Sequence, residues 1–384
     1  MGRLLLREYR VLLQSSALLG LVVVLPVLMI ALMTGIFRVG IPTGMAMAVV
    51  DLDRSDLSRS LTRMLDAAPE VEVTHQALSL SEARALIVSG AVRGAIFLPP
   101  DLERNITRGE RPEIVTFYDN QHMSAGSLVA RGARNAIDTA LAGVRLSVRQ
   151  GQGEAPAQAQ VALQPIPLQT HALFNPSFDY VHFLLAALVP TVLQIVAAAG
   201  TAYAVSLDFG PGRDPQGLVR LAGGLLPALL GKILPYTALF LLILGVSDVV
   251  LYGWLDVPLR GSLPLMAGGA VLFVLASQLI GTLAFVATRD IGAAASIIAV
   301  ITAPAFGFMG LGFPREAMGP LAQLWGALIP GTWYVQLRID QSLRATPLDI
   351  SIWPVLWLTL IAVGLAGLTL AQLTRLRRND RIAA

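Results

Sequence analysis

The sequence predicts an α-helical integral membrane protein with about six transmembrane helices and an inserted α/β extracytoplasmic domain. Hydrophobic residues make up 55% of the chain and charged residues 14%, roughly half of the charged fraction of about 25% in typical soluble domains. Six segments stay apolar over about 20 residues, the length that a helix needs to cross the hydrocarbon core of a bilayer. Between the first two segments, short apolar runs alternate with amphipathic stretches, which favours a small α/β domain.

Residues 1–16 predict an amphipathic helix that lies at the cytoplasmic interface of the membrane. Apolar residues recur at helical spacing, and arginines occupy the opposite face. The alternative is a frayed extension of the first transmembrane helix. The apolar set is Leu5, Leu6, Tyr9, Leu12 and Leu13, and the polar set is Arg3, Arg7, Arg10 and Gln14.

The first transmembrane helix is predicted over residues 17–37, which end just before Arg38. Only Arg289 and Asp290 separate the fourth helix from the fifth, so a tight turn must join them. A cleaved signal peptide is the alternative interpretation of the first segment, but its apolar run is longer than a signal core. The other five helices lie within residues 181–373, at 181–205, 233–251, 263–288, 291–311 and 352–373.

The distribution of arginine predicts that both chain termini face the cytoplasm, because short cytoplasmic segments carry the excess of positive charge. Arginines precede the first helix, and four more lie in the C-terminal tail, residues 374–384. The segment 206–220 after the second helix is also basic and is predicted to be cytoplasmic. Residues 38–180 hold 13 arginines against 15 acidic residues. This segment has no positive excess and is predicted to lie outside, as a periplasmic domain.

The periplasmic domain is predicted to contain four strands and three helices. Period-two alternation marks the strands, and serines before amphipathic runs mark the helix starts. The strands are 45–50, 71–74, 94–98 and 114–118; the helices follow Ser55, follow Ser79 or Ser81, and span 124–149; a loop at 151–160 leads to a return segment at 161–170.

Three aspartates after the first strand, Asp51, Asp53 and Asp56, raise the question of a metal site. Their oxygen ligands suit calcium or magnesium, but the spacing lacks the glycine and the distal glutamate of an EF-hand loop. We therefore interpret them as strand-end and helix-cap residues. The four histidines are dispersed along the chain, so no metal site is predicted.

Six short motifs occur in a fixed order along the chain. They are VDLDRS at 50–55 with LSR at 57–59, GAIFLPPDL at 94–102, YDN at 118–120, FNP at 174–176, GKILPY at 231–236 and GFPREAM at 312–318. Taken together, over essentially the whole chain, they resemble the ABC type-2 export permeases. The resemblance is to the bacterial subgroup with a large periplasmic domain between the first and second transmembrane helices.

The resemblance implies the permease subunit of an ATP-binding-cassette exporter in the bacterial inner membrane, which moves an amphipathic or lipophilic substrate such as a drug or a lipid. The implied partners are a cytoplasmic ABC ATPase subunit, a second copy or a related permease subunit, and membrane lipid. A periplasmic adaptor is left open, and nucleic acid is not expected. No cofactor is expected in this chain, because ATP and Mg²⁺ would bind the partner subunit.

The sequence around Lys232 agrees with a permease that does not hydrolyse ATP itself. A P-loop requires a glycine five residues before Gly231 and a serine or threonine after the lysine. Leu226 and Ile233 occupy these positions. Neither the G-x-S-x-G motif of serine hydrolases nor the H-E-x-x-H motif of metalloproteases occurs in the sequence. We therefore do not expect the chain to be an enzyme.

The resemblance also places an ATPase-coupling helix in the first cytoplasmic loop, residues 206–220. The family commonly has paired glutamates there, and aspartates stand in their place in this chain. Pro211 and Pro215 are expected to interrupt the helix, and a solvated turn is the alternative. The predicted contact residues are Asp208, Arg213, Asp214 and Gln216.

Uncharged polar residues inside the predicted spans mark a candidate substrate path. The interpretation that we favour for them is interhelical hydrogen bonding. The near absence of charge within the spans favours an amphipathic or lipophilic cargo. The family further places short re-entrant helices at 312–350, with a break at Gly331, where protein or water must satisfy the backbone. The candidate path residues are Thr191, Gln194, Tyr203, Ser277 and Gln278.

Other classes of function are kept as alternatives. A non-transporting scaffold or sensor would act through the periplasmic domain and would need no ATPase. A secondary transporter would predict inverted repeats and ionisable residues inside the spans, and the sequence pattern indicates neither. An enzyme would require a convergent nucleophile and base in the periplasmic domain.

Overall fold

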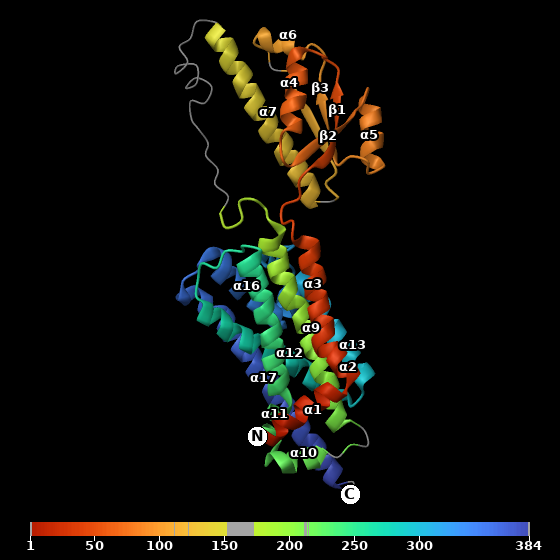
Figure 1. Ribbon diagram of the computed structural model, residues 1–384, viewed down its shortest axis with the longest axis vertical. Coiled ribbons are helices and arrows are strands. Elements are labelled where there is room, and N and C mark those ends of the chain that lie inside the picture. The colour runs from red at the N-terminus through yellow and green to blue at the C-terminus, as the bar shows by residue number, and fades with distance from the viewer. Residues whose placement is uncertain are drawn as a thin grey trace. The chain divides into compact units, whose positions relative to one another are not determined.

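The computed structural model describes residues 2–110, 112–121, 123–151, 173–210, 213 and 215–382. The chain divides into two compact units (Figure 1). We call Met1–Gly40 with Ala172–Ala384 the membrane unit, and Ile41–His171 the inserted unit. Within the described residues, six helices of the membrane unit are long and apolar enough to cross a bilayer. The inserted unit contains a four-stranded sheet. The predicted fold class, a helical membrane protein with an inserted α/β domain, is confirmed.

The six spans follow the apolar segments of the sequence, but the third begins at Leu225 instead of residue 233 and so includes Lys232. The first span joins α2 (Ser16–Leu19), η1 (Gly20–Val24) and α3 (Leu25–Phe37); the others are η2 (Val181–Leu185) with α9 (Ala186–Phe209), α11 (Leu225–Val249) with η3 (Val250–Trp254), α12 (Leu263–Thr288), α13 (Ile291–Thr302) with α14 (Ala305–Phe308), and α17 (Leu348–Ile382).

Helices α9 and α12 form the buried centre of the membrane unit because small side chains let their backbones touch. The facing residues Ala198, Ala202 and Ala284 are all buried. A Cβ atom added to Gly281 of α12 would lie only 1.8 Å from the carbonyl oxygen of Ala198. Close backbone approach of this kind is the usual basis of helix association in membranes, where burial of apolar surface drives little.

Replacing Gly281 by alanine should therefore destabilise the membrane unit by about 1–3 kcal/mol or more, the range for overpacking a tight contact. The backbone of Ala198 cannot move aside as a flexible side chain could. Thermal unfolding of the purified chain in detergent measures the effect. Gly268→Ala on the same helix is the matched control, since nothing lies within 4 Å of its added Cβ. Equal unfolding temperatures for the two variants would contradict the prediction.

Both chain termini lie at one end of the membrane unit, which we call the terminal end (Figure 1). Helices α1 (Gly2–Gln14) and α10 (Pro215–Ala222) also lie there. Pro215 is the first residue of α10. A proline at this position is compatible with a helix, because the first helical N–H has no partner within the helix. Pro215 thus starts the helix of the 206–220 loop instead of interrupting it, and Pro211 lies outside the described residues.

Short helices connect the fifth span to the sixth at the far end of the membrane unit. They are η4 (Arg315–Ala317), α15 (Pro320–Leu328), α16 (Pro330–Ile339) and η5 (Asp340–Arg344). The break between α15 and α16 falls at Ile329, where the chain is extended, and not at Gly331 as predicted, because Pro330 starts α16 and Gly331 lies in its first turn. The N–H of Gly331 donates to the side-chain oxygen of Gln194 in α9 at 2.7 Å, which satisfies one free amide at the start of α16. Their position relative to the bilayer stays a prediction.

The inserted unit is built on a sheet of strand order β2-β1-β3-β4, in which β1 is parallel to β2 and β3, and β4 is antiparallel to β3. Residues of β1 alternate between the two faces. Met47 and Val49 pack toward α4 and α7, and Ala48 and Val50 pack toward α5. The elements are β1 (Met45–Asp51), α4 (Asp56–Asp66), β2 (Val71–Gln76), α5 (Leu80–Val88), β3 (Gly94–Leu98), α6 (Leu102–Thr107), β4 (Val115–Tyr118) and α7 (Met123–Gly151).

The aspartates after β1 bind backbone and side-chain donors of the inserted unit. Asp51 accepts from the Ser58 hydroxyl at 2.7 Å and from two backbone amides of the following turn. Asp53 accepts from the amides of Leu102 and Glu103 at the start of α6, a helix that the sequence pattern did not predict. Ser79, rather than Ser81, caps α5. The predicted return segment 161–170 lies outside the described residues.

Candidate functional site

Four charged side chains form a cluster at the terminal end of the membrane unit, which we call the ion cluster; Glu8, Lys232 and Asp208 are at most 10% exposed, and Arg7 is 37% exposed. The Lys232 ammonium of α11 lies 2.8 Å from a carboxylate oxygen of Glu8 in α1 and 2.5 Å from an oxygen of Asp208 in α9. Arg7 contacts both carboxylates, that of Glu8 at 2.7 Å. The Tyr236 hydroxyl also donates to Glu8, at 3.3 Å. The ion cluster therefore joins three separate helices.

The two cations and two anions of the ion cluster balance, which is what allows them to be buried. The side chains of Lys232 and Glu8 are each 1% exposed, and that of Asp208 is 10% exposed. An unpaired ion would cost several kcal/mol at such a site. The hydrogen bond to Asp208 raises the pKa of Arg7 above its ordinary value. The contact with Asp208 thus stabilises the charged form of Arg7.

The packing of α1 against α11 positions the ion cluster. Leu4, Glu8 and Leu12 are spaced four residues apart, which places them on one face of α1. All three are buried. A Cβ on Gly231 would lie 3.0 Å from the side-chain end of Leu4, so the glycine favours a close approach of the two helices. Sequence reasoning overlooked Glu8. Its signal is that it is the sole acidic residue before Asp51, on the same helix face as two leucines.

The predicted ATPase-coupling residues do not form one group. Asp208 belongs to the ion cluster, where its carboxylate binds Arg7 and Lys232. Arg213 and Gln216 are exposed at the terminal end, Gln216 in the first turn of α10. Asp214 lies outside the described residues. Their contact with an ATPase stays a prediction.

The candidate path residues lie among the central helices of the membrane unit. Gln278 of α12 accepts from the Thr237 hydroxyl of α11 at 2.6 Å, which ties two spans together. Within the described chain, the buried side-chain nitrogen of Gln194 has no hydrogen-bond partner. Tyr203 is half-buried. Thr191 and Ser277 are buried and donate to carbonyl oxygens of their own helices. Interhelical bonding accounts for Gln278, while a substrate path stays a prediction.

A second buried ion pair lies at the far end of the membrane unit. A guanidinium nitrogen of Arg338 in α16 is 2.7 Å from a carboxylate oxygen of Asp248 in α11, and the Arg338 side chain is 1% exposed. The guanidinium lies 5.6 Å from the ring centres of both Tyr252 and Tyr334. Tyr334 in turn stacks on Phe273 of α12 at 4.6 Å. The pair thus fixes α16 against two spans.

An apolar cavity of about 530 Å³ opens beside this ion pair, between α11 and α12. Leucine, valine, alanine and methionine side chains form most of its wall. Its polar groups are Asp248, Tyr252 and Tyr334. Val249 and Leu263 at its margin are largely exposed, so the cavity is accessible from the surface of the spans. An apolar wall with a few polar groups at one edge is typical of sites for amphipathic small molecules.

The ion cluster is suited to transmitting movement between helices. Asp208 lies in the last turn of α9, directly before the chain continues to α10. Separating it from Lys232 would remove one of the two charged partners of each group, Arg7 remaining with Asp208 and Glu8 with Lys232, which is costly at a site with little access to water. We therefore expect a displacement of the 206–220 loop to move α1 and α11 with it. Among the described residues, no three histidine, aspartate or glutamate side chains gather as ligands for a metal ion.

Six spans, an inserted unit after the first span and ionic contacts between helices describe a multi-pass membrane protein of the transporter type. Residues 17–371 match the family described as ABC-2 family transporter protein. The chain belongs to this family and is an ABC transporter permease, as the resemblance of its motifs predicted. The family implies an ATPase partner subunit.

Two relatives from Escherichia coli (strain K12) cover most of the chain. The chain is 26% identical over 334 residues to the inner membrane transport permease YhhJ. This match covers 85% of the chain and 83% of the relative. The chain is 24% identical over 317 residues to the probable multidrug ABC transporter permease YbhS. This match covers 82% of the chain and 81% of the relative. No solved structure matches the chain with significance.

Proposed function

We propose that the chain is the permease subunit of an exporter in the bacterial inner membrane and that it moves an amphipathic or lipophilic substrate out of the cytoplasm or the membrane. A separate cytoplasmic ATPase subunit powers the transport. Two permease chains, identical or related, form the pathway, and both termini face the cytoplasm. The name of the relative YbhS, a probable multidrug permease, supports this class of substrate.

The apolar cavity between α11 and α12 is the observation that supports the substrate class best. Apolar side chains make up most of its wall, and Asp248 supplies a carboxylate at the edge. A hydrophobic molecule with one polar group matches this distribution. A strongly hydrated sugar or ion does not, because the wall offers few replacements for its hydrogen bonds with water.

Transport by the reconstituted complex tests the proposal directly. The chain and its ATPase subunit are placed in vesicles, and movement of a fluorescent lipophilic dye is followed with and without ATP. ATP-dependent movement of the dye toward the face that carries the inserted unit is expected. ATP-dependent movement in the opposite direction would refute export, and movement of a hydrophilic sugar alone would refute the substrate class.

Charge reversal at Arg213 should uncouple ATP hydrolysis from transport. This exposed arginine precedes α10 at the terminal end, where the proposal has the ATPase bind. An Arg213→Glu substitution should lower substrate-stimulated ATPase activity by roughly tenfold, the effect of losing about 1.4 kcal/mol of interfacial attraction. Arg260→Glu is the matched control, since Arg260 is exposed in the loop before α12, at the far end. If both variants keep wild-type stimulation, the docking assignment fails.

A non-transporting scaffold or sensor is the alternative function. The inserted unit, with its own hydrophobic core, would then be the active part. Co-purification distinguishes the two, because a scaffold has no need of an ATPase. Stable recovery of the chain without any ATPase, from cells that express both, would favour the scaffold.

A further inference from the structure

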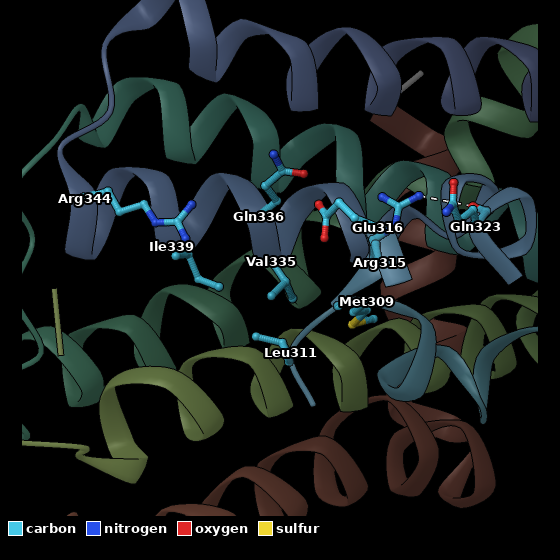
Figure 2. A pocket seen from close by; sticks show the side chains of 10 residues that line it. Met309, Leu311, Arg315, Glu316, Gln323, Val335, Gln336, Ile339 and Arg344 are labelled. Carbon is cyan, nitrogen blue, oxygen red and sulfur yellow. Dashed lines mark hydrogen bonds between the residues drawn. The ribbon is translucent and has the colours of Figure 1, made fainter. Parts of the chain in front are cut away.

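A second cavity, of about 380 Å³, lies among the short helices at the far end of the membrane unit (Figure 2). Its apolar wall includes Val335 and Ile339 of α16. Two arginines line it, Arg315 of η4 and Arg344 of η5. In Figure 2, Arg315 lies on one side of the view and Arg344 on the other, with the apolar wall between them. This arrangement combines cationic groups with a hydrophobic surface.

The Arg315 guanidinium lacks a full set of acceptors. One terminal nitrogen donates to the carbonyl oxygen of Gln323 at 3.1 Å, and the group lies 5.1 Å from the ring centre of Trp333. Its Nε is buried and, among the described residues, has no hydrogen-bond partner. Burial lowers the pKa of Arg315, although the neighbouring Glu316 opposes this. An anion in the cavity would supply a further acceptor for this group.

The cationic groups that line the cavity favour a ligand with acceptor oxygens. Arg315 and Arg344 are cationic, and the exposed carboxylate of Glu316 is the anionic group of the lining. Arg344 is also 3.4 Å from Asp340 and is 53% exposed. The two cations and two anions balance, so the attraction for a phosphate comes from the guanidinium donors and not from an excess of charge. A phosphodiester has one negative charge, and guanidinium groups bind phosphate oxygens through paired N–H donors.

The exposed face of α15 indicates that the cavity lies at the depth of lipid headgroups. Leu321, Leu324 and Leu328 recur at helical spacing and are 83%, 60% and 59% exposed. Such a face is stable when it lies in hydrocarbon. Arg315 precedes α15 by a few residues and places its charge beside this apolar face. Arginine side chains at this boundary reach toward the headgroup layer.

We propose that this cavity binds the headgroup of a membrane phospholipid. Arg315 donates to the phosphodiester through the terminal nitrogen that its hydrogen bond to Gln323 leaves available, Arg344 closes the other side, and the acyl chains lie along the leucines of α15. The apolar wall of α16 contacts the glycerol backbone. This lipid site is separate from the cavity between α11 and α12 and does not depend on the substrate or the direction of transport.

Lipid binding to the full chain in detergent tests the proposal. Dioleoylphosphatidylglycerol, dioleoylglycerol and inorganic phosphate are added separately, and bound lipid is counted by native mass spectrometry while thermal unfolding is followed. Phosphatidylglycerol should bind and raise the unfolding temperature. Dioleoylglycerol and inorganic phosphate should do so far less. If dioleoylglycerol binds as well, the phosphate is not recognised, and if inorganic phosphate alone gives the full effect, the site is for a free anion.

Substitutions of the two arginines complete the test. Arg315→Gln should weaken phosphatidylglycerol binding roughly ten- to a hundredfold, the effect of losing a charged hydrogen bond. Arg344→Gln should weaken it in the same direction. Because Arg344 also contacts Asp340 and the ring of Phe174, the unfolding temperature of this variant without lipid is measured alongside. Arg38→Gln changes an exposed arginine directly after α3, away from the cavity lining, and this variant should bind the lipid as the wild type does. Unchanged binding by both Arg315→Gln and Arg344→Gln would overturn the proposal.

Discussion

Replacing Lys232 by methionine should destabilise the membrane unit by about 3–5 kcal/mol, the cost of removing one partner from a buried ion pair. Glu8 would lose the ammonium at 2.8 Å, and its 1% exposed side chain would retain only Arg7 and the Tyr236 hydroxyl as partners. Asp208 would keep Arg7. Thermal unfolding in detergent and the amount of chain recovered from membranes measure the loss.

A double substitution separates the loss of pairing from the loss of packing. Glu8→Met combined with Lys232→Met removes the anion together with its cation, so it should cost less than the sum of the two single substitutions. Replacing a whole buried pair by apolar side chains is often nearly neutral. If Lys232→Met alone unfolds at the wild-type temperature, the ion cluster does not stabilise the protein.

Apolarity was sufficient to predict the six spans and the insertion point of the second unit, but not the ion cluster. A charged residue ends an apolar window, so the sequence predicts a span that begins at residue 233, directly after Lys232. In the structure the helix begins at Leu225, and Lys232 is tolerated inside because Glu8, 224 residues earlier in the sequence, pairs with it. Such a long-range contact leaves no local pattern.

The polar residues of the spans show the same limit. Their positions could be predicted, but their partners depend on which helices are adjacent. Gln278 meets Thr237 of a different span, and Gln194 meets the backbone of Gly331 in α16. By contrast, the strands and helix caps of the inserted unit rest on local signals. There Ser55 and Ser79 cap the helices that they were expected to start.

The pair of Asp248 and Arg338 is a second long-range contact that the sequence pattern did not reveal. Asp248 was the single charge in an apolar segment, and Arg338 fell in the predicted re-entrant region. The structure brings them to 2.7 Å and leaves Arg338 only 1% exposed. Because Asp248 also lines the apolar cavity, this pair could serve both stability and the proposed substrate site. The two roles can be separated by substitution.

Arg338→Met should destabilise the membrane unit by about 3–5 kcal/mol, because it leaves Asp248 without its buried cation. Arg338→Lys should restore only part of this loss, since an ammonium cannot reproduce the planar contacts of a guanidinium with two tyrosine rings. Arg104→Met is the control for a surface ion pair. Both side chains of its pair with Asp101 are exposed, 57% and 52%, so the change should cost less than about 1 kcal/mol. Thermal unfolding in detergent compares the three.

Combining Arg338→Met with Asp248→Leu tests what else the pair does. Removing both charges should recover most of the stability lost in Arg338→Met, because no unpaired ion remains. Transport of a lipophilic dye by this stable double variant then reports on the cavity alone. Lost transport with wild-type stability would show that the carboxylate at the cavity edge takes part in substrate binding. Transport at the wild-type rate would mean that the pair only fixes α16 against the spans, and that the cavity selects its substrate by apolar contact.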